Sequence, residues 1–311
     1  MKKLLIFAFA TLAMLACTER NTPSNGSGES SATSPATTDG ELTGVFSVST
    51  TKKIHFSKGN LQYQKSTKTC RFAEHQYDRI GYTNRDVIMI ESSTDWLDLF
   101  AWGTGMTPDL SNYKNSFANY GKDGEDITGT NRDWGVYNKI VNGGNEAGLW
   151  RTLTYQEWEY LFKGRTDASR LFGFGKVYSV EGIILLPDGW VTPDGLTFNP
   201  STEKGLDPTY YNSKKDNYSH NSYTETEWKK MEAAGAVFLP SAGWLSTSYT
   251  DAIYTKASNS INEYDGYYWS SSFAYELIFS NADLRFFSYS TTAQWKSNVH
   301  QIAVRLVRDI E

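Results

Sequence analysis

The segment from residue 150 to 165 constrains the fold of this chain most, because it carries a complete set of helix-start signals. Thr154 is followed three residues later by Glu157, the pattern of a capping box, in which each side chain accepts a hydrogen bond from the other residue's backbone N–H. Leu153 just before the cap and Trp158 in the first turn are spaced as a hydrophobic staple. The segment therefore predicts a helix that begins at Thr154.

The apolar residues of this helix predict that one of its faces is buried. Trp158, Leu161 and Phe162 recur at the i, i+3, i+4 spacing of a stripe that packs against a core. Gly164 stands where helices commonly end in a left-handed residue. We therefore expect the helix to end at Gly164.

A second helix is predicted by the same signals. Thr224 and Glu227 form a capping-box pattern, Tyr223 and Trp228 form a staple, and Gly235 marks the helix end. Alternating apolar residues elsewhere predict antiparallel strands and hairpins, in the ranges 44–72, 236–239 and 267 onward. Two helices with strands before and after them indicate an α+β domain.

The residues between 94 and 148 are predicted to form a short helix and then a long loop. The stretch from Thr94 to Trp102 suits a short amphipathic helix on which Asp95 and Asp98 both face solvent. Residues 103–148 are rich in Gly, Asn, Asp and Tyr, which predicts a loop. Loops of this length in compact domains are usually functional or ordered by their own side chains.

The first 40 residues predict a leader and a tether. Lys2 and Lys3 precede a short apolar run and then Cys17, the arrangement of an export signal whose run is too short to span a bilayer. Residues 18–40 are mostly Ser, Thr, Gly, Pro and Asn, and cannot bury enough apolar surface to become ordered. The interpretation divides the chain into a signal peptide at 1–16, a flexible tether at 17–40 and a folded domain at 41–311.

The residues before Cys17 resemble a bacterial lipobox, which implies that Cys17 carries lipid; the alternative is an ordinary secretory peptide cut nearby. With Cys17 lipidated, Cys70 has no partner for an internal disulfide and is predicted to be a small buried apolar residue. The chain has 30 Lys and Arg against 35 Asp and Glu, for a net charge of −5, with no visible basic patch. We therefore expect no nucleic-acid partner, and membrane contact through the lipid alone.

Several ordered motifs resemble a known family. The first helix, with its Trp-Arg-x-Leu-Thr start and its Glu-Trp-Glu-Tyr, is similar to a helix of C-type-lectin-like bacterial domains. These domains include relatives of the formylglycine-generating enzyme and the major paralogous domain (FISUMP-like) surface proteins. The likeness extends to the ranges 182–188, 237–243, 266–272 and 304–308. It implies a C-type-lectin-like fold with an N-terminal β-hairpin elaboration, in which the last strand returns to the core and brings the chain ends close.

No catalytic residue, metal or cofactor is predicted. The formylglycine-generating relatives oxidise with a cysteine pair and copper, whereas only Cys70 remains here beside the lipid anchor. The four histidines show no close-spaced metal pair, and nucleophile-elbow, phosphate-loop and dinucleotide motifs are missing from the sequence. The sequence also lacks the triplets with which classical lectins hold calcium. The acidic cluster at 123–126 is interpreted as a solvated turn, with calcium binding as the alternative.

The C-terminal segment from 270 to 301 predicts a recognition face. It mixes Tyr, Ser, Asn, Phe and Trp in the way of a paratope, where rigid rings bind diverse surfaces at a low entropic cost. If Leu277 and Phe279 face inward, their neighbours face outward by strand parity. The candidate ligand-binding residues are Glu276, Ile278, Arg285, Phe287, Tyr289, Trp295, Asn298 and His300.

These observations predict an exported lipoprotein of the outer membrane, displayed at the cell surface, that is not an enzyme and binds a protein or glycan through this face. Some lectin-like surface lipoproteins with a similar ending are diversified by retroelements that mutate adenines, and diversification is a second hypothesis for this segment. Against it, Glu276 and Trp295 cannot arise from an Asn codon by changes at adenines alone. The alternative function is a structural or assembly subunit of a surface appendage or envelope complex.

Overall fold

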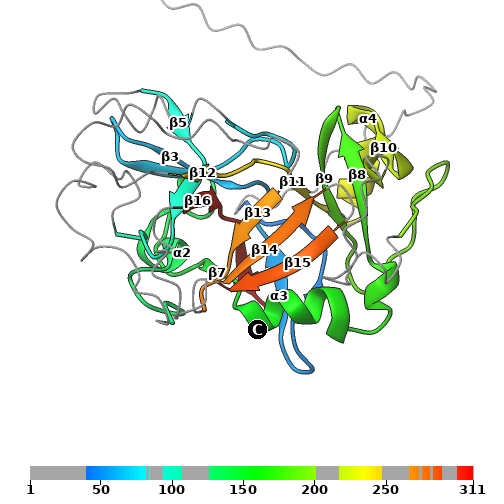
Figure 1. Ribbon diagram of the computed structural model, residues 1–311, viewed down its shortest axis with the longest axis horizontal. Helices are drawn as coiled ribbons and strands as arrows, with labels where there is room; N and C mark the ends of the chain where they lie inside the picture. The colour runs from blue at the N-terminus through cyan, green and yellow to red at the C-terminus, as the bar shows by residue number, and fades with distance from the viewer. Residues whose placement is uncertain are drawn as a thin grey trace, which may run out of the picture. The chain divides into compact units, whose positions relative to one another are not determined.

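The computed structural model describes residues 40–81, 84, 94–106, 126–200, 217–246, 266–272, 275–280, 283–288 and 300–310. The chain divides into a unit Met1–Thr33 and a compact unit Ser34–Glu311, and all described residues belong to the second. They form a mixed α+β fold with many short strands in several small sheets and few helices (Figure 1). The predicted leader, Cys17 and nearly all of the tether lie outside the described residues. Within the described ranges, no helix is long and apolar enough to cross a bilayer.

The first sheet joins the start of the compact unit to its end. Its strands are antiparallel and run in the order β1 (Phe46–Ser47), β2 (Lys53–Phe56), β17 (Leu306–Asp309) and β7 (Arg151–Thr152). The Ile310 N–H extends the pairing by donating to the Lys53 carbonyl at 3.0 Å. The expectation that the final strand returns to the beginning of the domain is therefore confirmed.

The first predicted helix is confirmed at its start. Helix α3 (Tyr155–Glu159) has Thr154 as its N-cap: the Glu157 N–H donates to Thr154 Oγ1 at 3.2 Å, and the Thr154 N–H donates to Glu157 Oε2 at 2.9 Å. Leu153 and Trp158 are fully buried in the same core, as the staple predicts. The Trp158 ring packs at 6.4 Å from the ring of Tyr268 in β13 (Gly266–Trp269), so this helix is fixed against the C-terminal strands.

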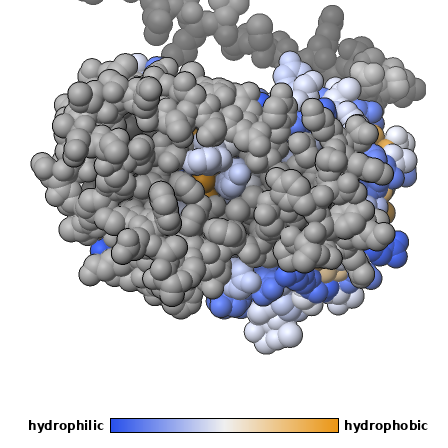
Figure 2. Space-filling view, viewed as in Figure 1, coloured by the Kyte–Doolittle hydropathy of each residue, from blue (hydrophilic) through white to orange (hydrophobic). Residues whose placement is uncertain are grey.

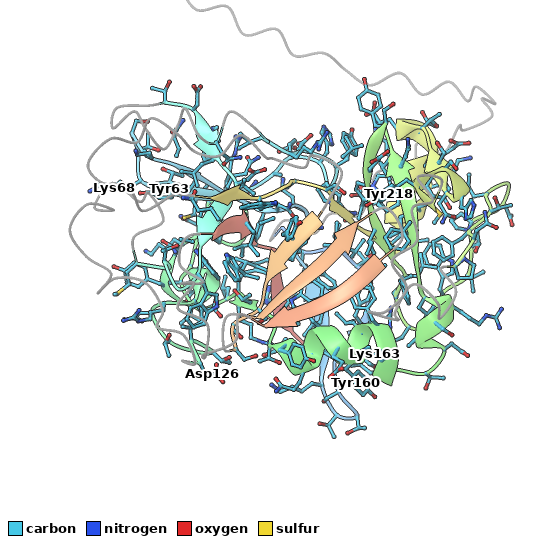
Figure 3. The ribbon with its side chains drawn as sticks, viewed as in Figure 1. Tyr63, Lys68, Asp126, Tyr160, Lys163 and Tyr218 are labelled. Carbon is cyan, nitrogen blue, oxygen red and sulfur yellow. The ribbon has the colours of Figure 1, made fainter. Side chains whose placement is uncertain are left out.

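The end of this helix differs from the prediction. The chain continues from α3 into a π-helical turn, Tyr160–Gly164, and the next residue, Arg165, is extended with φ −76°. Gly164 ends the turn as expected, but it does not adopt the left-handed conformation that we predicted for it. Glycine is required because a Cβ here would collide with the Tyr160 ring. The outer side of this helix carries Lys163, whose Nζ lies 3.0 Å from Glu159 Oε1 (Figure 3).

The second predicted helix is confirmed at both ends. Helix α4 (Glu225–Ala233) begins with a capping box between Thr224 and Glu227. Gly235 has φ +98° and donates to the Glu232 carbonyl at 2.8 Å, while the Ala236 N–H donates to the Met231 carbonyl at 3.0 Å. This pair of bonds is a Schellman motif, which lets the chain turn directly into the next strand. That strand belongs to a sheet with the order β10 (Ser222–Tyr223), β8 (Phe172–Val177), β9 (Val180–Leu185) and β11 (Val237–Pro240).

The remaining strands form two further sheets. The larger contains the C-terminal strands in the order β12 (Leu245–Ser246), β16 (His300–Ala303), β13, β14 (Tyr275–Ser280) and β15 (Asp283–Ser288), with β6 (Leu99–Ala101) paired to β16. The smaller has the order β4 (Thr69–Phe72), β3 (Leu61–Gln64) and β5 (Trp96–Leu97). Strands are thus present in all the ranges where the sequence predicts them.

The short helix predicted from Thr94 to Trp102 is wrong. This stretch contains the strands β5 and β6, and its residues Leu97, Leu99 and Phe100 are all fully buried. A short apolar run that is covered on both sides has no helical period, so periodicity alone could not distinguish strand from helix. Asp98 is also fully buried, which contradicts the expectation that it faces solvent.

The predicted long loop is confirmed where the structure describes it, at 103–106 and 126–148. These residues contain one short helix, α2 (Trp134–Tyr137), and otherwise turns and isolated bridges. Of the acidic cluster at 123–126, only Asp126 is described, and it forms a bridge to Ser272. The surface over the β1–β2 hairpin and α3 is mostly hydrophilic, as expected for the outer side of elements packed against a core (Figure 2).

Replacement of Thr154 by Ala removes the oxygen that accepts from the Glu157 N–H. We expect this change to lower the free energy of unfolding by about 1 kcal/mol, the usual loss for an N-cap. Thr154→Ser keeps an oxygen in place and is expected to be close to wild type. Urea denaturation of the variants measures the difference, and equal midpoints for the Ala and Ser variants would contradict the capping role.

Candidate functional site

Four of the eight predicted recognition residues are brought together in two neighbouring strands. In the antiparallel pairing of β14 with β15, Glu276 lies opposite Phe287 and Ile278 lies opposite Arg285. Directly opposite residues share one face of a sheet. These four residues therefore form one continuous face, which we call the β14–β15 face; the two strands are labelled in Figure 1.

The register also shows which side of the sheet this face occupies. Leu277 lies opposite Tyr268, which is fully buried in the main core, so Glu276 and Ile278 belong to the other side of the sheet. This agrees with the predicted alternation along the strand. On that other side, Trp269 lies opposite Glu276 and is itself fully buried. This side of β13 is therefore part of the core at Trp269 and does not belong to the β14–β15 face.

The other predicted recognition residues are not part of this face as described. His300 lies in β16, and β13 stands between β16 and β14 in the sheet order. It is therefore separated from the four by a whole strand. Tyr289, Trp295 and Asn298 lie outside the described residues.

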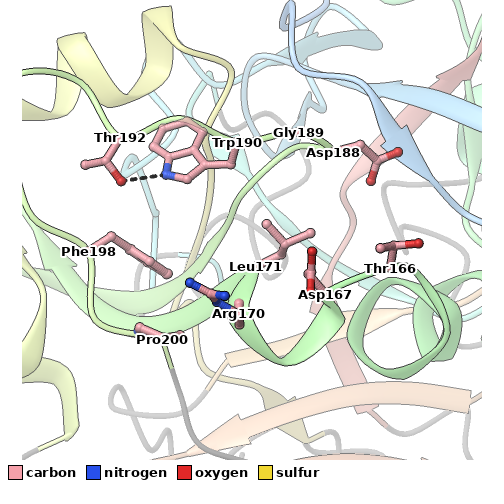
Figure 4. A pocket seen from close by; sticks show the side chains of 10 residues that line it. All are labelled: Thr166, Asp167, Arg170, Leu171, Asp188, Gly189, Trp190, Thr192, Phe198 and Pro200. Carbon is pink, nitrogen blue, oxygen red and sulfur yellow. Dashed lines mark hydrogen bonds between the residues drawn. The ribbon is translucent and has the colours of Figure 1, made fainter.

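A pocket that sequence reasoning missed lies beside the other end of the first helix. Its volume is about 610 Å³, within the range of small-molecule sites. Two segments supply its walls: the turn that follows the π-helical turn and the loop that follows β9 (Figure 4). We call it the Trp190 pocket; its lining residues are Thr166, Asp167, Arg170, Leu171, Asp188, Gly189, Trp190, Thr192, Phe198 and Pro200.

Local hydrogen bonds shape both walls of the Trp190 pocket. In the turn, Asp167 adopts a left-handed conformation with φ 56° and its carbonyl accepts from the Arg170 N–H at 2.8 Å. In the loop, Trp190 Nε1 donates to Thr192 Oγ1 at 3.0 Å, which orients the half-buried indole (Figure 4). Phe198 packs against the same core cluster as Trp190. The aromatic rings are therefore held in place before any ligand arrives.

Arg165 holds the two walls together. Its buried guanidinium donates to the carbonyls of Leu171 at 3.2 Å and Leu186 at 2.8 Å. Leu171 lines the pocket in the first wall, and Leu186 stands two residues before Asp188, where the second wall begins. Burial lowers the pKa of Arg165 to about 10, against the opposing effect of the nearby Asp188 carboxylate. Asp188 lies 3.4 Å from Arg165 and accepts from the Ser47 N–H at 2.9 Å, so its charge is already compensated.

Two buried carboxyl groups elsewhere have raised pKa values. Burial raises the pKa of Asp98 and of Asp133 to about 6 in each case. Shifted groups of this kind are candidates for catalysis. Asp133, however, accepts from the Thr152 N–H at 3.0 Å and from the Gly135 N–H at 3.1 Å. Asp98 similarly accepts from the Ile80 N–H at 2.9 Å. Both groups therefore serve as internal acceptors for backbone donors.

The remaining ionisable groups do not assemble into a metal centre in the described part of the chain, where no three His, Cys, Asp or Glu residues cluster. Cys70 is buried, and this burial raises the pKa of its thiol to about 12, which confirms the prediction of a small apolar role. Trp158 and Trp228, the two staple residues, are buried in the core, and so is Trp269. The chain matches no model of a protein family, no curated protein and no solved structure.

Asp133 leads to a prediction about pH. Because the pKa of its carboxyl is raised from 3.8 to about 6 in the folded protein, the fold binds this proton more tightly than the unfolded chain does. Its stabilising contribution is complete below pH 3.8 and is lost as the pH rises through 6. As the pH falls from 7 to 4, the wild type should gain about 2 kcal/mol relative to Asp133→Asn. Urea denaturation across this range tests it, and a constant difference would contradict it.

Proposed function

We propose that this chain is a non-catalytic recognition protein that binds a protein ligand through the β14–β15 face. The observation that carries the proposal is the register that places Glu276 opposite Phe287 and Ile278 opposite Arg285. One acidic, one basic and two apolar residues then share a single face. Interfaces between proteins combine an apolar centre with charged residues that set orientation and specificity, and this composition suits that role.

The shape of the face favours a protein over a glycan as the ligand. Two paired strands of six residues each present a ribbon, and a ribbon of alternating side chains suits contact with another extended surface. Small ligands are usually held in concave sites instead. A protein ligand is therefore the better match to the β14–β15 face.

The scaffold that we propose is C-type-lectin-like. Support comes from the two capped helices, from the strands that precede and follow them, and from the pairing of β17 with β2, which brings the last strand back to the first hairpin. Long connections between short strands are also present in the described part of the loop at 126–148. Because folds host many functions, the proposal for recognition depends on the face and not on this likeness.

The location that we propose is the cell surface, on the outer membrane, with lipid on Cys17 and a tether that leads to the folded domain. The composition of residues 1–40 supports this arrangement, since a charged start, an apolar run and a Cys precede a polar, Gly- and Ser-rich stretch.

A second candidate function is assembly with other subunits, and the position of β15 favours it. Among the described strands, β15 pairs only with β14, so its other edge has backbone donors and acceptors that a strand of another molecule could engage. An assembly subunit would form stable oligomers or envelope complexes through this edge. A recognition protein would instead lose its ligand when side chains of the face change.

The β14–β15 face is tested by two substitutions. A screen of the full chain against arrayed surface and extracellular proteins supplies a ligand. Arg285→Glu and Phe287→Ala should then weaken its binding at least about tenfold, because such positions carry much of the energy of an interface. The matched controls are Lys139→Glu and Val191→Ala, since both side chains are exposed and lie in other segments. Unchanged affinity in both face variants, with normal folding, would exclude this face.

The lipid anchor has its own test. In bacterial cells grown with labelled palmitate, the wild-type chain should take up label and sediment with membranes, whereas Cys17→Ser should do neither. Cys70→Ser serves as the matched control, because Cys70 is buried in the fold. Label that persists in Cys17→Ser would show that lipid is not attached at this residue.

A further inference from the structure

The Trp190 pocket contains two charged side chains that the fold itself does not use. In the described part of the chain, neither the Arg170 guanidinium nor the Asp167 carboxylate takes part in a hydrogen bond or an ion pair within the protein. Both are exposed and line the same pocket. In the view of Figure 4, the Arg170 side chain lies between those of Phe198 and Asp167. A donor group and an acceptor group are therefore both available to a ligand.

The two groups have complementary hydrogen-bonding capacity. A guanidinium only donates and an ionised carboxylate only accepts. A ligand that satisfies both has to offer acceptors and donors on adjacent atoms, and neighbouring hydroxyl groups do so, because each hydroxyl donates one hydrogen bond and accepts others. Arg170 and Asp167 thus select a ligand with several hydroxyls along one edge.

The aromatic residues of the pocket require that the ligand also has an apolar face. Trp190 and Phe198 are half-buried, and Leu171 is 8% exposed, so part of the pocket wall is apolar. The face of an aromatic ring is electron-rich and attracts polarised C–H groups. A ligand that fits this wall has a flat C–H face in addition to its hydroxyl edge. A pyranose ring has both features, and the volume of about 610 Å³ accommodates one or two such rings.

The charge balance of the pocket indicates that the ring is neutral. The formal charges of Arg170 and Asp167 sum to zero although the two groups form no ion pair, and the third charged residue of the lining, Asp188, is paired with Arg165. A net charge on the ligand would therefore remain uncompensated on binding. We propose that the Trp190 pocket binds a neutral pyranose, with its C–H face against Trp190 and Phe198 and its hydroxyls between Arg170 and Asp167.

This site is independent of the β14–β15 face, because no residue belongs to both. The test titrates the full chain with the methyl pyranosides of glucose, galactose, mannose and N-acetylglucosamine, and with methyl glucuronide as an acidic comparison. Isothermal titration calorimetry or saturation-transfer NMR gives the affinities. At least one neutral pyranoside should bind saturably and more tightly than the glucuronide.

Two variants locate the binding. Asp167→Asn and Arg170→Gln should each weaken the neutral pyranoside about tenfold or more, because each loses a hydrogen bond to a charged group. Neither change removes a side-chain hydrogen bond or ion pair found in the described part of the fold, and Asn tolerates the left-handed conformation of residue 167. Asp194→Asn, in an exposed position of the same loop, is the matched control and should bind like the wild type.

The aromatic wall has a separate pair of variants. Trp190→Ala should abolish measurable binding, whereas Val191→Ala, at a neighbouring side chain that is 79% exposed, should not change it. Thermal unfolding of each variant checks that the fold persists. The proposal is overturned if no neutral pyranoside binds, if only the glucuronide binds, or if Asp167→Asn and Arg170→Gln both bind like the wild type. None of these results bears on the protein ligand of the β14–β15 face, which Phe287→Ala tests.

Discussion

The buried guanidinium of Arg305 connects the parts of the fold on which both candidate sites depend. This side chain is fully buried, and it donates to Gln76 Oε1 at 2.9 Å and to Asn60 Oδ1 at 3.4 Å. Asn60 in turn donates to the hydroxyl of Tyr268, and that hydroxyl donates to the Pro240 carbonyl at 2.9 Å. One polar chain thus links the segment before β17, the segment before β3, strand β13 and the end of β11.

A charge in this position constrains the structure because it is costly to bury without partners. Burial lowers the pKa of Arg305 to about 10, so the group keeps its proton at neutral pH and has to be solvated by the protein. Gln76, which accepts one hydrogen bond from Arg305, is itself fixed by two further bonds: its oxygen also accepts from the Phe238 N–H at 2.8 Å, and its nitrogen donates to Glu232. An alternative packing of the sheets would separate these partners and leave the guanidinium unsatisfied.

Each of the two candidate sites is connected to one of the sheets that this network joins. Strand β13 contributes Tyr268 to the network and is followed in its sheet by β14 and β15, which form the proposed recognition face. Strand β11 contributes Pro240 and pairs with β9, whose end leads into the loop of the Trp190 pocket. Loops and edge strands that are supported by a rigid interior are common places for binding residues. The paired strands β14 and β15 and the Trp190 pocket are therefore both supported by one common core.

The sequence alone determined the features that depend on residues close together in the chain. The capping boxes at Thr154 and Thr224 are contacts over three residues, so their pattern was sufficient to predict them. Only the tertiary structure decided the rest. The stretch around Asp98 became two strands because it is covered on both sides, which its composition could not reveal. The Trp190 pocket exists because Arg165 joins two segments about twenty residues apart, and such a contact leaves no periodic signal in the sequence.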